Sequence, residues 1–191
     1  MLQARKKQEG AFMSDKAKEK QNVINVLNQA RKMELHAIHQ YMNQHYNLDD
    51  MDYGELAGNI KLISIDEMRH AEQFAERVKE LGGEPSSDLS AAVVKGQEVR
   101  GIFPYDSDLE DNTIARYNEF RKQCLENGDS LTAKLFDAII AEEQEHYNYF
   151  DNVATHISTL GDTYLSKIAG SKAASVPSRG FVSAREAGAQ D

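Results

Sequence analysis

Residues 64–71 read SIDEMRHA, with Glu67 three positions before His70. A second pair with the same spacing, Glu143 and His146, stands near the end of the chain. Residues three apart lie on one face of an α-helix, and apolar residues recur at helical spacing before and after both pairs. Both Glu-x-x-His pairs are therefore predicted to face the core of a helical protein.

Two single glutamates occupy similar positions on two further predicted helices. Glu34 stands in an apolar stripe with Leu27 and Tyr41. Glu110 has a weaker stripe and an ordinary alternative role, because Ser107 three residues earlier could form a capping box with it at a helix start. The weaker stripe consists of Glu110, Ile114, Tyr117 and Leu125, with Arg121 intruding.

Four buried carboxylates would be expensive without a cation. An unpaired buried ion costs several kcal/mol, and a whole domain is stabilised by only about 5–15 kcal/mol. Arg121 could offset one charge and protonation others, whereas two divalent cations balance four carboxylates. One Glu from each of two helices and Glu-x-x-His from each of two others is the ligand set of ferritin-like di-iron and di-manganese bundles. The pattern thus favours a two-metal site.

The spacing of apolar residues and of helix breakers predicts five helices. The second begins with a capping box of Asp52 and Glu55, and Asp129 or Ser130 caps the fourth. The predicted helices cover residues 15–46, 52–81, 106–127, 130–160 and, as a short fifth helix, 162–169.

The connections between these helices predict the topology. The first and third are short, which makes their helices antiparallel. Residues 84–105 contain two prolines and two glycines and are expected to be non-helical. Fully extended, they reach about 70 Å, enough to cross a helix about 45 Å long. We expect an all-α, ferritin-like four-helix bundle with one long crossover and a short fifth C-terminal helix.

Length and composition indicate one globular domain. The 191 residues carry a net charge of −9, which argues against a nucleic-acid partner. Neither a signal peptide nor a membrane span is apparent, and the single Cys124 suits a reducing compartment, so we expect a cytoplasmic protein without a membrane partner. The expected division is a disordered N-terminal extension over residues 1–14, a ferritin-like di-iron domain over 15–170 and a flexible tail over 171–191.

The chain resembles bacterioferritin from about residue 20 to residue 170. The resemblance is carried by residues 33–41 (MELHAIHQY), 64–71 and 142–146 (EEQEH). It implies a ferroxidase centre with two irons per subunit, where Glu67 and Glu143 bridge and Tyr41 lies nearby. The implied ligands are Glu34, Glu67, His70, Glu110, Glu143 and His146. The implied activity is oxidation of Fe(II) to Fe(III) by O2 or H2O2.

The resemblance also assigns a role to Met68, which periodicity alone would treat as a packing residue. It implies that Met68 and the same residue of a symmetry-related subunit ligate the iron of a haem or related porphyrin shared by two subunits. It further implies a shell of twenty-four subunits, built from two-fold dimers, that stores ferric mineral. An electron-donor redox protein would be a further partner.

The chain departs from the bacterioferritin pattern at an inner-surface iron site. Many members place a histidine four residues before the acid that corresponds to Asp66, and this chain has Leu62 there. That iron route is therefore doubtful. The additional histidines His36, His39 and His45 are expected to be solvated or to lie at an interface.

Two other functions remain open from the sequence. A rubrerythrin-like or di-manganese peroxidase could use the same bundle, since Glu and His ligands do not select iron over manganese. The single cysteine disfavours a rubrerythrin, which has a Cys-rich iron module. A non-catalytic helical assembly protein with structural zinc is the third candidate.

Overall fold

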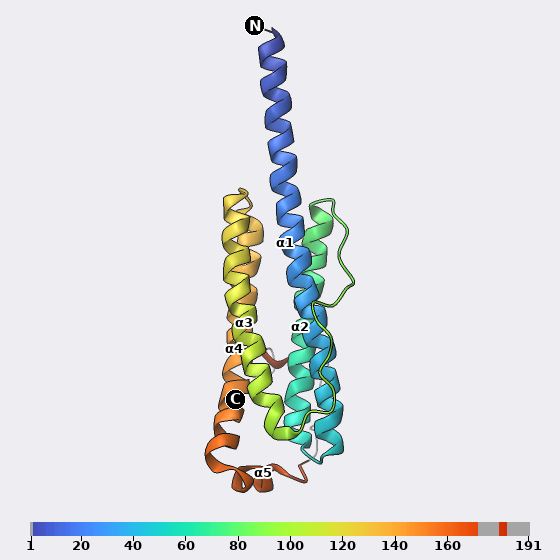
Figure 1. The fold of residues 1–191 in the computed structure, drawn as a ribbon, viewed down its shortest axis with the longest axis vertical. Coiled ribbons are helices and arrows are strands. Elements are labelled where there is room, and N and C mark those ends of the chain that lie inside the picture. Colours follow the sequence, from blue (N-terminus) through green and yellow to red (C-terminus); the bar gives the residue numbers. More distant parts are fainter. Residues whose placement is uncertain (1, 172–179, 183–191) are drawn as a thin grey trace, which may run out of the picture.

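The computed structural model describes the backbone of residues 2–171 and 180–182, with side chains from residue 15 onward. Its helices are α1 (Leu2–Asp50), α2 (Gly54–Glu80), α3 (Val99–Glu126), α4 (Ser130–Leu160) and α5 (Asp162–Ile168). No strand is formed within these ranges. The first four helices form an elongated bundle, and α5 lies across one end (Figure 1).

The bundle is built from two helical pairs, α1 with α2 and α3 with α4. Residues 81–98 connect the pairs and run along the outside of α1 and α2 (Figure 1). This is the predicted long crossover, and the ferritin-like four-helix topology is confirmed. Hydrogen bonds anchor the crossover to α1, because the Gln40 side chain binds the backbone N–H and C=O of Val94.

The first helix begins earlier than predicted. Residues 2–14, expected to be a disordered extension, are helical and extend α1 beyond the bundle (Figure 1). This stretch contains no proline, and most of its residues are good helix formers such as Ala, Lys, Gln and Arg. Most of the predicted tail, residues 172–179 and 183–191, lies outside the described residues.

One predicted helix cap is wrong and another is confirmed. Asp52 adopts a left-handed backbone conformation with φ of 65° in the turn, and the residue that caps α2 is Tyr53, without a side-chain hydrogen bond. Asp is one of the few residues that tolerate this conformation. At α4 the Asp129 side chain accepts a hydrogen bond from the backbone N–H of Thr132, as expected of an N-cap.

The third helix also starts earlier than predicted, at Val99 instead of Asp106. Pro104 lies inside it, and the preceding Ile102 and Phe103 are fully buried. Packing of these apolar side chains thus outweighs the helix-breaking signal that proline gives in sequence. Since the helix begins well before Ser107, Glu110 is not part of a capping box, and its ordinary alternative role is excluded.

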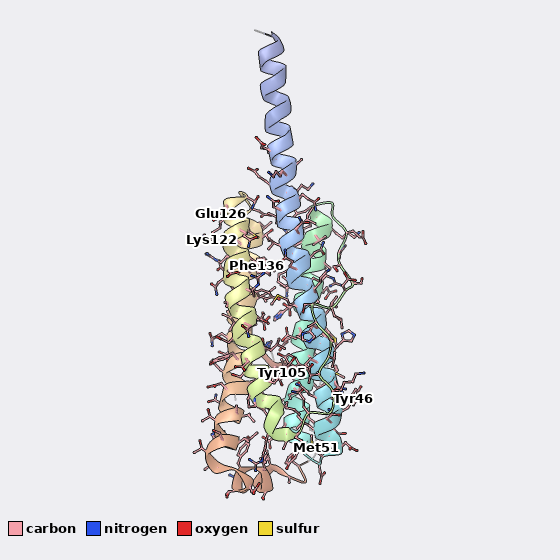
Figure 2. All side chains as sticks on the ribbon, in the orientation of Figure 1. Tyr46, Met51, Tyr105, Lys122, Glu126 and Phe136 are labelled. Atoms are coloured by element: carbon pink, nitrogen blue, oxygen red, sulfur yellow. The ribbon has the colours of Figure 1, made fainter. Side chains whose placement is uncertain are left out.

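Two apolar clusters fill the bundle, one on each side of a polar middle. The Phe136 cluster includes Leu27, Phe74 and Cys124, and the Phe150 cluster lies toward α5. Figure 2 shows Phe136 between the helices, while Lys122 and Glu126 point outward from α3. The stripe predicted for α3 is wrong at two positions, because Leu125 is 46% exposed and Arg121 pairs with Asp137 on the surface. The buried hydrophobic residues of α3 are Val99, Ile102, Phe103, Tyr117, Phe120 and Cys124.

Candidate metal centre

Four helices bring the six predicted ligands together between the two apolar clusters. The residues form two groups whose ligand atoms lie within 4.8 Å of one another and which share Glu67 and Glu143. One group is completed by Glu34 and His70, the other by Glu110 and His146. All six side chains are at most 2% exposed.

The two Glu-x-x-His pairs face each other from α2 and α4. His70 Nδ1 lies 3.2 Å from Glu67 Oε2 and 3.2 Å from Glu143 Oε1. His146 Nδ1 lies 3.0 Å from Glu143 Oε2 and 3.1 Å from Glu67 Oε1. Each imidazole thus directs Nδ1 toward both shared carboxylates.

Two tyrosines hold the single glutamates in a crosswise arrangement. The Tyr41 hydroxyl on α1 donates to Glu110 on α3, and the Tyr117 hydroxyl on α3 donates to Glu34 on α1. The first contact places Tyr41 beside the site, as the resemblance implied. Sequence reasoning assigned no site role to Tyr117, although its position two helical turns after Glu110 was a signal that could have found it.

The residue before each shared glutamate reaches across to the opposite histidine. Glu142 Oε2 lies 3.3 Å from His70 Nε2, within hydrogen-bond distance. Asp66 Oδ2 lies 3.6 Å from His146 Nε2, which has no hydrogen-bond partner among the described residues, so this contact is an electrostatic approach. A carboxylate at this side of a metal-binding imidazole fixes the ring and its tautomer. An acid directly before each Glu-x-x-His pair was visible in the sequence, but its crossing to the other helix requires the fold.

Burial and mutual repulsion perturb these groups in the absence of a cation. Burial, with the Glu143 and Glu67 carboxylates, raises the pKa of Glu34 and the pKa of Glu110 well above the usual range. Burial lowers the pKa of His70 and His146, but nearby carboxylates outweigh it and raise both pKa values. Burial would also raise the pKa of Glu67, yet both imidazoles bring that pKa well below its normal value.

The side chains fit a pair of divalent cations. Glu67 Oε1 and Glu143 Oε1 are buried without a hydrogen-bond partner among the described residues, although each lies close to an imidazole. Arg121, predicted as an offset for one charge, lies on the surface and cannot serve. Carboxylate and imidazole ligands suit iron, manganese or zinc. Two such cations would balance the four carboxylates.

A cavity of about 60 Å³ leads to this cluster from the side of α1 and α3. Glu34, Glu67, Glu110 and Glu143 line its inner end. The other residues that line it are Met33, His36, Ala37, Ser90, Leu109, Asn112 and Thr113. No lysine or arginine is among these lining residues, so the cavity favours a cation.

The remaining predicted residues lie apart from the cluster. Met68 is 44% exposed on α2, in a groove that also contains Leu35 and Ala71. His39 is exposed as expected. His36 and His45 are buried, at 4% and 8% exposure, so they are not solvated. The alternative that they lie at an interface stays a prediction. Both lie on the face of α1 covered by the crossover or by α2, where His36 lines the cavity and His45 contacts the Ala57 carbonyl.

Comparisons with known proteins agree with this arrangement. The ferritin-like domain family matches residues 24–160. The bacterioferritin of Desulfovibrio desulfuricans is 62% identical over 169 residues, which cover 88% of this chain and 94% of the relative. Bacterioferritin BfrA of Mycobacterium tuberculosis is 32% identical over 145 residues, covering 76% and 91%.

Two solved structures of bacterioferritins also match this chain. A crystal structure of the D. desulfuricans bacterioferritin, which describes its diiron site in different catalytic states, matches with a TM-score of 0.83 and 60% identity over 85% of this chain and 95% of the other. The M. tuberculosis BfrA structure matches with a TM-score of 0.73 and 31% identity over 77% and 93%. Within the described residues, no helix is long and apolar enough to span a membrane.

Proposed function

The chain belongs to the bacterioferritin family, and from this premise we propose that it is a ferroxidase, which oxidises Fe(II) to Fe(III) with O2 or H2O2. The family assignment confirms the resemblance and does not favour a rubrerythrin-like or di-manganese peroxidase. The observation that carries the proposal is the pair of overlapping ligand groups, which share Glu67 and Glu143. We assign Glu34, Glu67, His70, Glu110, Glu143 and His146 as ligands of a di-iron centre.

Some residues of the proposed centre balance the metal charge, and others orient the ligands. Glu67 and Glu143 lie between both histidines and can each contact two metal positions. The hydroxyls of Tyr41 and Tyr117 orient the two terminal glutamates and can hold a proton beside them. The apolar clusters on both sides limit bulk water. A pair of iron ions bound there would supply the electrons that reduce the oxidant.

Removal of one Glu-x-x-His pair tests this assignment. Glu67→Ala together with His70→Ala should abolish rapid Fe(II) oxidation, measured by stopped-flow absorbance, while the helical content and the oligomer size stay unchanged. The matched control is Glu76→Ala together with His39→Ala, which alters an exposed Glu and an exposed His outside the cluster. Oxidation by the first variant at the wild-type rate would refute the site.

We also propose that Met68 ligates a haem or related iron porphyrin between two subunits. Its thioether is exposed in a groove with small residues beside it, Ala71 and Ala75, where a second copy and a flat ring could approach. Met68→Leu keeps the size and apolar character but removes the sulfur ligand, so the low-spin haem spectrum should be lost. Met42→Leu on α1 is the control, and retention of the spectrum by Met68→Leu would contradict the proposal.

The same family relationship supports assembly into a shell of twenty-four subunits made of two-fold dimers. We propose that ferric product is stored inside it and that an electron-donor protein reduces it for release through the haem. Light scattering should give the mass of a 24-mer, about twenty-four times the 21.4 kDa chain. A stable dimer under iron-loaded conditions would contradict storage in a closed shell.

A further inference from the structure

Residues 180–182 return to the middle of the bundle after the chain has passed α5. Ser171 is held at the far end, where its carbonyl accepts from the backbone N–H of Gly54. Gly180 contacts Asp66, twelve residues along α2 from Gly54, a rise of about 18 Å. The nine steps from Ser171 to Gly180 span up to about 30 Å, so one chain reaches both positions.

Phe181 and Val182 bind at the seam between α2 and α4. The Phe181 ring is 6% exposed, with its centroid 5.1 Å from that of Tyr149 and 6.2 Å from that of His146. The backbone N–H of Val182 donates to Asp66 Oδ2 over 3.0 Å. α2 and α4 approach each other less closely than the paired helices do, so this segment covers a seam that the helices leave open.

The fit requires glycine at position 180. A Cβ atom there would lie 1.5 Å from Asp66 Oδ1 and 2.3 Å from Asp66 Cγ, far inside van der Waals contact. Asp66 is itself 1% exposed and is held by Arg69 Nη1 at 2.9 Å, so its carboxylate has little room to move away. An alanine would push the segment off the seam.

This contact bears directly on a candidate ligand. Asp66 uses Oδ2 for both the Val182 N–H and the approach to His146 Nε2. An imidazole that keeps its proton on Nε2, toward a carboxylate, presents the lone pair of Nδ1 to a metal. His146 Nδ1 is the atom that faces Glu67 and Glu143.

We infer that Gly180, Phe181 and Val182 form a C-terminal cap that closes the α2–α4 seam and positions His146, through Asp66, as a metal ligand. Phe181 covers the ring, and the Val182 N–H fixes the carboxylate beside it. The inference rests on the proposed metal centre. The three cap residues are positioning residues and have no direct contact with a reacting atom.

The test compares Gly180→Ala with Gly101→Ala, since a Cβ at Gly101 meets nothing within 4 Å. A second pair compares a chain that ends after Arg179, which lacks the cap, with one that ends after Val182, which keeps it. The first readout is modification of His146 by diethyl pyrocarbonate in metal-free protein, measured by mass spectrometry relative to the exposed His39. The second is titration with Co(II).

In Gly180→Ala and in the chain that ends after Arg179, diethyl pyrocarbonate should modify His146 several-fold faster than in the wild type. One of the two Co(II) sites should also weaken by about 10–100-fold, as is typical when the partner of a ligating histidine is lost. Both controls should behave as wild type. Unchanged His146 reactivity, or equal weakening of both Co(II) sites, overturns the cap. If the wild type does not bind two Co(II) per chain, the proposed metal centre is refuted as well. The experiment therefore distinguishes failure of the cap inference from failure of the metal centre.

Discussion

The proposed metal centre has two halves with the same types of candidate ligand and different surroundings. The His70 half contains Glu34 and is backed by Glu142, whose side chain is 38% exposed. The His146 half contains Glu110 and is backed by Asp66, whose side chain is 1% exposed beneath Val182. The carboxylate beside the histidine is thus partly exposed to solvent in the His70 half and buried between α2 and α4 in the His146 half.

This difference indicates that two near-symmetric sets of candidate ligands should not give equivalent metal positions. The Asp66 contact with His146 is longer than the Glu142 contact with His70, at 3.6 Å against 3.3 Å. Interactions with a charge are stronger in a dry setting than beside water, so burial should still make Asp66 hold its histidine more firmly than Glu142 does. Because Glu142 is partly exposed, the His70 half is also the one in which a ligand can move with less disturbance. We expect the two halves to respond unequally to matched substitutions.

The largest expected effect comes from removal of either histidine. His70→Ala and His146→Ala should each leave about one Co(II) per chain and slow Fe(II) oxidation by more than about a hundredfold, beyond the loss seen when only the partner of a ligand is removed. Metal analysis and stopped-flow absorbance would measure both. Two Co(II) bound by either variant would break the assignment of one histidine to each half.

The second expected effect is on the pH dependence of metal-free stability. Glu34, Glu110, His70 and His146 all have a raised pKa in the folded chain. The glutamates contribute stability that is complete below their unfolded pKa of about 4.3, and the histidines below about 6.5. These contributions are lost as pH rises toward the folded pKa values, so thermal stability of the metal-free protein should fall from about pH 5 to pH 8.

Metal should reverse this trend, because a cation favours carboxylates and neutral imidazoles. The low pKa of Glu67 has the opposite sign, and its contribution is lost only on strong acidification. Calorimetry from pH 5 to pH 8, with and without Co(II), measures the difference. Glu34→Gln together with Glu110→Gln should flatten the metal-free curve, and an unchanged slope would disprove that these two glutamates contribute to the trend.

The third expected effect concerns Asp66 and Glu142, the carboxylates that lie beside His146 and His70. Asp66→Asn should weaken the His146 metal position by about 10–100-fold, while Glu142→Gln should weaken the His70 position by less, because the Glu142 side chain is 38% exposed. Co(II) titration of the two variants gives both affinities. Equal losses would mean that burial under the C-terminal cap adds nothing.

The smallest effect is expected for the tyrosines, one of which contacts the terminal glutamate of each half. Tyr41→Phe and Tyr117→Phe each remove one hydrogen bond to a buried carboxyl group, so each should lower metal-free stability by about 1–2 kcal/mol. Denaturant unfolding measures both. The Tyr117 hydroxyl also lies 3.4 Å from the Ala30 carbonyl, so a loss far larger for either variant would show that the two tyrosine contacts are not equal in energy.

Much of the centre could be predicted because its signal is local. Glu67 with His70, and Glu143 with His146, repeat a spacing that places each pair on one helical face, and burial of Glu34 follows from the same periodicity. Glu110 had the weakest sequence signal of the candidate ligands, because its predicted apolar stripe included Leu125 and was interrupted by Arg121, both of which the structure places on the surface.

The remainder depends on contacts between distant residues. Nothing near Pro104 indicates that Ile102 and Phe103 would pack firmly enough to extend α3 across it. The pairing of Tyr117 with Glu34, and of Asp66 with His146, needs the register between helices. Phe181 lies in an Ala, Ser and Gly rich region that reads as a tail, and its place on His146 has no counterpart in local periodicity.

Cys124, the only cysteine of the chain, lies in the Phe136 cluster and is fully buried. Burial raises the pKa of its thiol to about 12. The thiolate is the form that attacks peroxide, so at neutral pH this sulfur is almost entirely in its unreactive thiol form. If the proposed metal centre turns over H2O2, this buried thiol should therefore stay reduced during turnover.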